Sequence, residues 1–331
     1  MDRKRNPVPK DRAHSVRRPL HLNVTDNGDM RKGGRAVRLK LFDKLTEDLS
    51  RSILGKRGVV LCPLCLAEFG RDAAESGLLT EEHVIPNSTG SREVTLTCKP
   101  CNDRLGYQID HHLARKIRLD RGFKGGETLK GHLRWSDGGA PADVVVGPSG
   151  DVRFHLKPTT PEMESLMVER ASQYARGERQ LRLRVINGLS LSKYLASVAK
   201  AAYLGLFVDR GYAYILLPSL GPIRRAINDD GPERKRLSEI IVPCEITDFT
   251  DLPDAPDRVT FETHSLGGIP VCLSMINLRN LSGAAWAVLP PGTNVNTGAW
   301  DGLARAADAL QGKSNVQIEV KPGGEVIVSG L

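Results

Sequence analysis

Apolar and polar residues follow two different patterns along this chain, one that predicts helices and one that predicts strands. From residue 38 to about residue 54 the apolar positions partly fit a helical stripe, and Gly55 is expected to end that helix. Residues 191–208 have the Ala-, Leu- and Val-rich composition of a largely buried helix. Short apolar runs dominate residues 239–329, where strands are predicted instead.

The same pattern predicts further elements in the C-terminal two-thirds. A helix is expected at 161–175, and the turn Pro148–Asp151 makes a hairpin of two of the strands. The expected strands are 129–135, 143–147, 151–156, 180–186, 239–246, 257–264, 270–278, 284–289 and 316–329. This mixture predicts an α+β domain, and no internal repeat is visible.

Length and composition suggest how these elements are grouped. The chain has 331 residues, 40% hydrophobic and 26% charged, which is typical of a folded protein of about two domains. Three segments are predicted: a basic arm with a helix at 1–57, a small module at 58–122 and a larger α+β domain at 123–331.

The positive charge is concentrated near the N-terminus. The net charge is +8, but residues 1–58 hold 16 Lys and Arg against 7 Asp and Glu, or +9, which leaves −1 for the rest. Two compatible interpretations remain: a solubilising, poorly ordered extension, or an arm whose basic side chains contact phosphates. The candidate contacts are Arg17, Arg18, Arg31, Lys32, Arg35, Arg38 and Lys40.

Apolar run lengths and cysteine usage bear on location. No apolar run approaches the roughly 20 residues that span a bilayer, so no membrane partner and a cytoplasmic location are expected. Six cysteines are too few for a disulfide scaffold in a chain this long. Four of them form two Cys-x-x-Cys pairs, Cys62/Cys65 and Cys98/Cys101, which indicates a tetrahedral structural zinc ion.

A second motif lies between and after these pairs. Glu82-His83-Val84-Ile85-Pro86 stands between them, and Asn102 follows the last cysteine. With the two pairs, this combination resembles the zinc-containing HNH endonucleases over about 60 residues. The resemblance implies a ββα-metal module, in which a hairpin and a helix surround one catalytic divalent ion.

The resemblance also implies a role for each residue of the motif. Glu82 and Asn102 would bind the divalent ion, Mg²⁺ or Mn²⁺, and His83 would be the general base. An imidazole can take a proton from water at neutral pH, and a hard cation offsets the charge that develops on a phosphate. Glu81 is a less favoured ligand, expected to share a side with His83 only after a kink.

Two positions depart from the family's pattern, and the surrounding basic residues have two interpretations. Glu82 stands where Asp is commoner in the family, a longer side chain that still reaches a cation. Glu93 stands where the family usually has Asn or His. Basic side chains on or near the helix expected after Cys101 would contact the nucleic-acid backbone or simply form a solvated face. They are Lys99, Arg104, Arg115, Lys116 and Arg118. His111 and His112 are expected to pack rather than to act in catalysis.

Together these features predict a cytoplasmic HNH endonuclease that hydrolyses DNA, of the kind found in restriction and phage defence. The alternative is a non-catalytic zinc-finger module that binds nucleic acid or protein. DNA against RNA, nicking against double-strand cutting, a homodimer, and a ligand or partner that regulates the C-terminal domain all stay open.

Overall fold

A computed structural model describes most of the chain. The described residues are 30–87, 93–123, 127–135, 138–147, 152–157, 160–176, 182–185, 188–245, 258–266, 269–277, 283–290, 299–311, 317–320 and 326–329. Expectations for the arm before residue 30, including Arg17 and Arg18, lie outside them, as do the side chains of Arg31 and Lys32.

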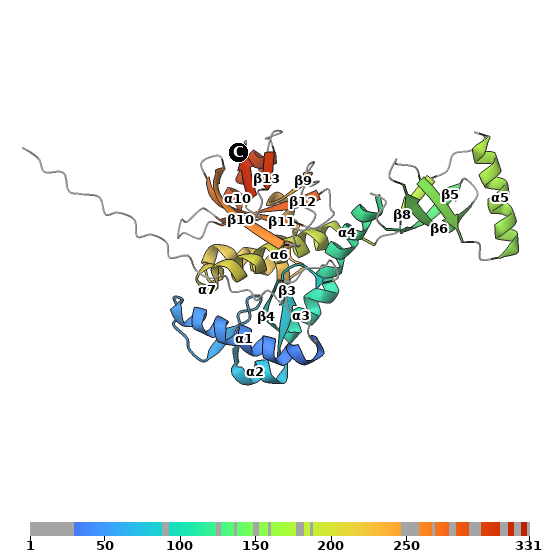
Figure 1. Cartoon of the computed structure of the whole chain (residues 1–331). Helices are drawn as coiled ribbons and strands as arrows, with labels where there is room; N and C mark the ends of the chain where they lie inside the picture. The colour runs from blue at the N-terminus through green and yellow to red at the C-terminus, as the bar shows by residue number, and fades with distance from the viewer. Residues whose placement is uncertain are drawn as a thin grey trace, which may run out of the picture.

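The N-terminal part is a small module in which two hairpins are surrounded by helices (Figure 1). Strands β1 and β2 pair with each other, as do β3 and β4, and both pairs are antiparallel. Its elements are α1 (Met30–Arg51), β1 (Val59–Leu61), β2 (Glu68–Gly70), α2 (Arg71–Ser76), β3 (Leu79–His83), β4 (Val94–Cys98), α3 (Lys99–Leu105), the π-helical turn η2 (Gly106–Asp110) and α4 (His111–Phe123).

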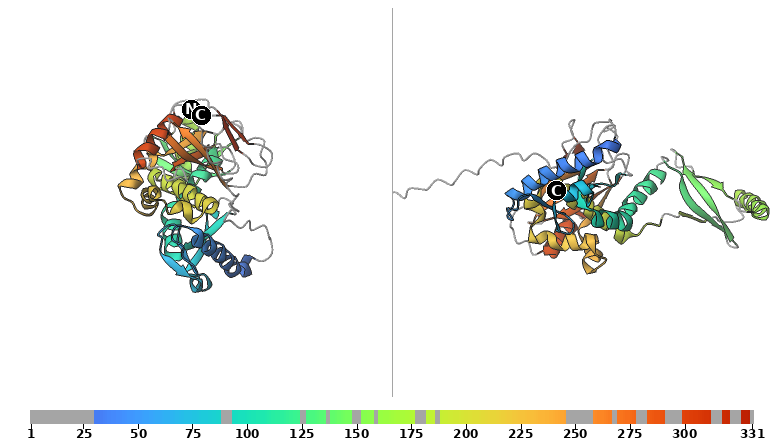
Figure 2. Two further views of the ribbon diagram at one scale, coloured as in Figure 1. Left: turned by 90° about the vertical axis from the view of Figure 1, so that its left-hand side faces the viewer. Right: turned by 90° about the horizontal axis from the view of Figure 1, so that it is seen from below.

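A second part projects from the rest of the molecule (Figures 1 and 2). It is an antiparallel sheet of order β7-β6-β5-β8 with one helix. Its elements are β5 (Leu129–Trp135), β6 (Gly138–Val146), β7 (Val152–Leu156), α5 (Pro161–Ala175) and β8 (Arg182–Val185). Its buried residues, such as Leu129 and Val144, are not part of the main core cluster.

The third part is built on the long helix α6 and an antiparallel sheet of order β10-β11-β12-β9. Four consecutive residues of β11, Val271 to Ser274, are buried, so both faces of this strand are covered. The elements are α6 (Leu191–Arg210), α7 (Tyr212–Ile215), η3 (Pro218–Leu220), α8 (Gly221–Asn228), α9 (Pro232–Lys235), η4 (Arg236–Glu239), β9 (Ile241–Glu245), β10 (Arg258–Leu266), β11 (Ile269–Asn277), β12 (Gly283–Leu289), α10 (Ala299–Gln311), β13 (Gln317–Val320) and β14 (Val326–Ser329).

Helix α6 joins the first and third parts into one hydrophobic core. It contacts α4 and η2 on one side and strands β9 to β12 on another, and Figure 1 shows it between β11 and β3. Residues 195–208 of this helix are all buried. A single core cluster therefore runs from Leu41 of α1 to Ala307 of α10.

The α+β fold class is confirmed, with a small module of two hairpins and helices followed by a larger mixed region. Helices 161–175 and 191–208 and most of the expected strands lie close to where the pattern predicted them, but β6 begins at Gly138 rather than at residue 143, and residues 316–329 contain two strands. The predicted turn Pro148–Asp151 lies outside the described residues. The first helix was expected to end at Gly55 but ends at Arg51, and a turn from Leu49 to Gly55 follows. The three segment boundaries stay predictions.

Among the helices of the described ranges, none has both the length and the apolar character needed to cross a membrane.

Candidate active site and metal centre

The first cysteine pair lies in the turn that joins β1 to β2. The Cys62 amide donates to the Ala67 carbonyl at 2.9 Å, and the Leu66 amide donates to the Cys62 carbonyl at 2.8 Å. Leu66 has a φ of 61°, a conformation that is uncommon for residues other than glycine. This tight turn brings the Cys62 and Cys65 sulfurs to one side of the hairpin end.

The second pair joins the first at the start of α3. Strand β4 ends at Cys98, and its amide donates to Cys62 Sγ at 3.4 Å. The four Sγ atoms lie within 4.8 Å of one another, and Cys65 Sγ is 3.7 Å from Cys98 Sγ. Tetrahedral zinc with Zn–S bonds of about 2.3 Å requires sulfurs about 3.8 Å apart. The four cysteines, here called the cysteine cluster, therefore form a candidate metal site that suits zinc.

Proton sharing within the cysteine cluster also suits a metal. A hydrogen bond from Cys62 lowers the pKa of Cys65 to about 5, and the same thiol lowers the pKa of Cys98 to about 7. Hydrogen bonds to Cys101, Cys65 and Cys98 together with burial raise the pKa of Cys62. These hydrogen bonds favour the thiolate forms of Cys65 and Cys98, and a fully deprotonated cluster would need a cation to offset its charge.

Three side chains of the C-terminal part hold the backbone around the first pair. The Tyr203 hydroxyl donates to the Pro63 carbonyl at 2.8 Å, and Asn228 Nδ2 donates to the Leu64 carbonyl at 2.8 Å. The Tyr212 hydroxyl donates to the Leu61 carbonyl at 2.6 Å and accepts from the Leu61 amide at 2.9 Å. The turn is thus fixed by contacts from α6, α7 and α8.

Strands β3 and β4 with helix α3 form the ββα unit that the motif predicts. The two strands pair in regular register from Leu79↔Cys98 to His83↔Val94, without a bulge. Alternation along β3 places Thr80 and Glu82 on one side and Glu81 and His83 on the other. The expectation that Glu81 would share a side with His83 only after a kink is therefore wrong, because residues two apart in a regular strand already do so.

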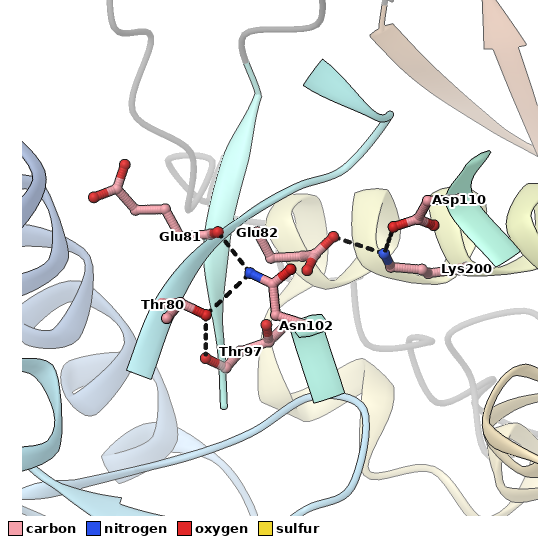
Figure 3. Close-up of polar contacts among 7 residues, drawn as sticks. All are labelled: Thr80, Glu81, Glu82, Thr97, Asn102, Asp110 and Lys200. Carbon is pink, nitrogen blue, oxygen red and sulfur yellow. Dashed lines mark hydrogen bonds and ion pairs between the residues drawn. The ribbon is translucent and has the colours of Figure 1, made fainter. Parts of the chain in front are cut away.

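The Glu81 carboxylate points away from Asn102 (Figure 3). It lies 4.0 Å from Arg38 Nη1 of α1 and is partly exposed. Partial burial raises the pKa of Glu81, and the Arg38 charge opposes that rise. Glu82, by contrast, lies on the Asn102 side of the strand.

Glu82 lies in a buried ionic contact with two residues outside the predicted motif. Lys200 Nζ of α6 is 2.6 Å from Glu82 Oε1 and 2.5 Å from Asp110 Oδ2. Glu82 is 4% exposed and Lys200 is 2% exposed. Glu82, Asp110 and Lys200 are here called the carboxylate cluster (Figure 3).

The carboxylate cluster strongly affects the charge of its members. Burial raises the pKa of Glu82 to about 7, and the nearby Lys200 charge limits that rise. Burial opposes the charged form of Lys200, but attraction to Asp110 and Glu82 is stronger and raises its pKa. Glu82 Oε2 makes no hydrogen bond of ordinary geometry within the described ranges, although the nearby Thr97 hydroxyl favours the charged form.

Asn102 is held against the hairpin by its amide nitrogen. Nδ2 donates to Thr80 Oγ1 at 3.0 Å and to the Glu81 carbonyl at 2.9 Å. Because both donor hydrogens are used, the amide oxygen is directed away from those acceptors, toward the side on which Glu82 lies (Figure 3). Two oxygen donors of the predicted ligand set, from β3 and α3, are thereby brought to one side of the hairpin.

The remaining residues discussed in the sequence analysis, His83, His112 and Glu93, differ in their burial and contacts. His83 is half-buried at the end of β3, on the face opposite Glu82 and Asn102, so the structure does not bring the predicted base together with the two predicted ligands. His112 is buried, and its Nδ1 accepts from the Ser190 amide at 3.1 Å, as expected for a packing residue. Glu93 precedes β4, where its carbonyl accepts from the Val84 amide at 3.0 Å.

The five basic residues predicted to contact nucleic acid differ in their surroundings. Lys99 is exposed and pairs with Asp103, whereas Arg104 is half-buried and donates to Asn228. Arg115 donates to the Gly188 carbonyl at 2.8 Å, Lys116 is half-buried and Arg118 is exposed. Lys99, Arg115 and Arg118 thus have the exposure that a contact with phosphates requires.

Asp110 and Lys200 were not identified from the sequence as site residues. Lys200 stands in the middle of the apolar segment 195–208, and a lysine buried in a helix requires an acidic partner. That signal was present. Asp110 gave no comparable signal, because its position depends on the π-helical turn η2.

Comparison with known proteins identifies one segment of the chain. Residues 62–118 match the model of the HNH endonuclease family, in agreement with the resemblance found in the sequence. The match begins at Cys62 and includes the whole cysteine cluster together with Glu82, His83 and Asn102. No curated protein and no solved structure matches the chain.

Proposed function

We propose that this chain, which carries an HNH endonuclease segment at residues 62–118, is a metal-dependent endonuclease that hydrolyses DNA phosphodiester bonds. The observation that carries the proposal is the placement of Glu82 and Asn102 on one side of a ββα unit, within the matched segment. Neither residue is needed by the cysteine cluster, so their joint placement supports a second, chemical site.

The donor set fits a hard divalent cation. Glu82 Oε2 lacks an ordinary hydrogen bond within the described ranges, and the Asn102 amide is fixed by its nitrogen so that its oxygen remains an acceptor. Carboxylate and amide oxygens are ligands that Mg²⁺ and Mn²⁺ accept. When bound, such an ion supplies positive charge to the phosphate oxygens.

The chain's own residues have distinct tasks in this proposal. Glu82 and Asn102 would hold the cation, and His83 would accept the proton of the attacking water. Because alternation places His83 on the opposite face of β3, this role requires the end of the strand to turn the imidazole toward Glu82. Lys99, Arg115 and Arg118 hold the phosphates on either side of the scissile bond. The cysteine cluster binds zinc, which joins the β1–β2 turn to the start of α3 and so fixes the helix that carries Asn102.

The test is cleavage of supercoiled plasmid by the full chain in EDTA, Mg²⁺ or Mn²⁺, after about one zinc per chain has been confirmed. Wild type is expected to cut only with a divalent ion, and His83→Ala is expected to be at least about 100-fold slower. His155→Ala is the matched control, because His155 is exposed in the projecting part. Equal cutting by His83→Ala and wild type would reject His83 as the base.

A second function is favoured by one observation: Glu82 is 4% exposed and already has a cationic partner in Lys200. A module with a permanently paired Glu82 would bind nucleic acid without cutting it. That function is supported if the zinc-loaded protein retains DNA but does not cut under any metal. Restriction or phage defence is the proposed setting of the nuclease, and plaque counts on cells expressing wild type or His83→Ala test it.

A further inference from the structure

Lys200 is an unusual component of a nuclease site because it comes from the middle of a core helix. Its ammonium lies at hydrogen-bond distance from Glu82 and Asp110, one from β3 and the other from the end of η2. Lysines are almost never fully buried unless they are paired. The two carboxylates and one ammonium together carry a net charge of −1, counted with all three groups charged.

The position of Lys200 is fixed by packing on both sides. Tyr203 lies three positions after Lys200 in the same helix, and its hydroxyl donates to the Pro63 carbonyl at 2.8 Å. Gly205 lies so close to β10 that an added Cβ would be 2.8 Å from Phe261 and 3.0 Å from Val259. A helix held at these points cannot withdraw its lysine without disturbing the core.

We propose that Lys200 is a built-in counter-cation for Glu82 and Asp110, and that it competes with the divalent ion for the Glu82 carboxylate. This inference rests on the proposed function, because it concerns the same cation site. Lys200 is a positioning residue: it is 2% exposed and has no access to a phosphodiester.

Electrostatics determines the direction of the effect. A divalent ion on Glu82 would lie within a few ångströms of the ammonium, and like charges at that distance in a buried site repel strongly. Wild type should therefore bind a lone divalent ion weakly. A phosphate brings negative charge that offsets the ammonium, so ion and nucleic acid should bind together more tightly than either binds alone.

The experiment measures Mn²⁺ affinity of the full-length, zinc-loaded protein by electron paramagnetic resonance of free Mn²⁺. Lys200→Met is expected to bind Mn²⁺ at least about 10-fold more tightly than wild type, because it keeps both carboxylates and loses the competing charge. Lys193→Met is the matched control, since it removes the same charge from the same helix outside the carboxylate cluster. Unchanged or weaker binding by a folded Lys200→Met would overturn the proposal.

A second variant keeps the test decisive if Lys200→Met does not fold. Asp110→Asn leaves the Glu82–Lys200 pair in place and removes one negative charge, so it is expected to weaken Mn²⁺ binding by about threefold or more. Equal or tighter binding by Asp110→Asn would contradict the counter-cation role, because the ammonium would then not govern the charge of the site.

The expected coupling between Mn²⁺ binding and DNA binding is tested in a His83→Ala background, so that the DNA is not cut during the measurement. Duplex DNA should increase Mn²⁺ affinity more in that background than in His83→Ala/Lys200→Met, and an equal increase would contradict the proposal. Glu82→Gln separates the two hypotheses. If Glu82→Gln leaves Mn²⁺ binding unchanged, the proposed ligand set fails; if it abolishes binding while Lys200→Met equals wild type, only the counter-cation role fails.

Discussion

The cysteine cluster and the carboxylate cluster lie in the same ββα module but are assembled from different parts of the chain. All four cysteines come from residues 62–101, whereas Lys200 is 118 positions from Glu82. One cluster is completed by two local turns, and the other only by the docking of α6. A local cluster can be identified from residue spacing, but a cluster shared between distant segments requires the fold.

The largest expected effect concerns the cysteine cluster. Cys98→Ser should lose the metal and lower the unfolding midpoint by at least about 10 °C, because structural zinc in small modules contributes about 10–16 kcal/mol of apparent binding free energy. Metal content by mass spectrometry and thermal unfolding by circular dichroism measure both. Cys272→Ala is the control: Cys272 is buried outside the cluster and should keep the metal. Full metal content in Cys98→Ser would show that the cluster does not need all four thiolates.

The carboxylate cluster is expected to stabilise the fold through the ion pairs of Lys200, without a bound divalent ion. Lys200→Met should lower the free energy of unfolding by about 3 kcal/mol, because it leaves the buried Glu82 and the half-buried Asp110 without their cation. Urea denaturation of the zinc-loaded chain measures this value. A Lys200→Met/Glu82→Gln double variant should recover part of the loss, and no recovery would indicate that the two residues are not energetically coupled.

Low pH is expected to lower the stability of the fold through His112 of α4, separately from any effect on the cysteine cluster. Burial and the neighbouring His111 lower the pKa of His112 to about 4, below the usual value near 6.5. The unfolded chain therefore binds more protons between these values, so stability present above about pH 6.5 is lost as the pH falls toward 4. We expect a loss of about 2 kcal/mol that is smaller in His112→Gln. The free energy of unfolding is measured against pH for wild type and His112→Gln, and the metal content at each pH shows whether zinc has been released. Identical profiles of the two proteins would reject His112 as the source of the loss.

The smallest expected effects on stability come from Tyr203 and Tyr212, whose hydroxyls contact the turn of the first cysteine pair. Tyr203→Phe should cost about 1–2 kcal/mol, because it leaves the Pro63 carbonyl buried without a donor. Tyr212→Phe should cost a similar amount through Leu61. Tyr107→Phe is the control, since Tyr107 is 85% exposed and should change stability by less than about 0.5 kcal/mol. Denaturant midpoints measure all three, and equal midpoints would mean that these bonds do not stabilise the module.

The sequence predicted elements well where one periodicity continued over many residues. Helices α5 and α6 and the strand β5 have the expected bounds or nearly so, because apolar spacing there is regular. Helix α10 was not predicted although it has 13 residues, and the short helices α2, α7, α8 and α9 were not predicted either. Each of these four short helices has eight residues or fewer, too few for a helical repeat to stand out, and helices this short are rarely stable without packing.

For the candidate site, the motif residues were accessible to sequence analysis and their partners were not. Cys62, Glu82 and Asn102 stand in a recognisable spacing. The contact of Glu82 with Lys200 depends on how α6 packs against the module, and no spacing rule connects positions 118 apart. Asp110 depends on five residues of π-helix, which rotates the side chains that follow and leaves no simple composition signal.

The bonds from Tyr203, Tyr212 and Asn228 have a consequence for engineering. They reach only main-chain atoms of Leu61, Pro63 and Leu64, so the bonds themselves do not depend on the side chains at these three positions. The reverse does not hold, because each bond needs its own tyrosine or asparagine. The module that carries the cysteine cluster should therefore resist transplantation, unless its new host supplies equivalent donors to the same turn.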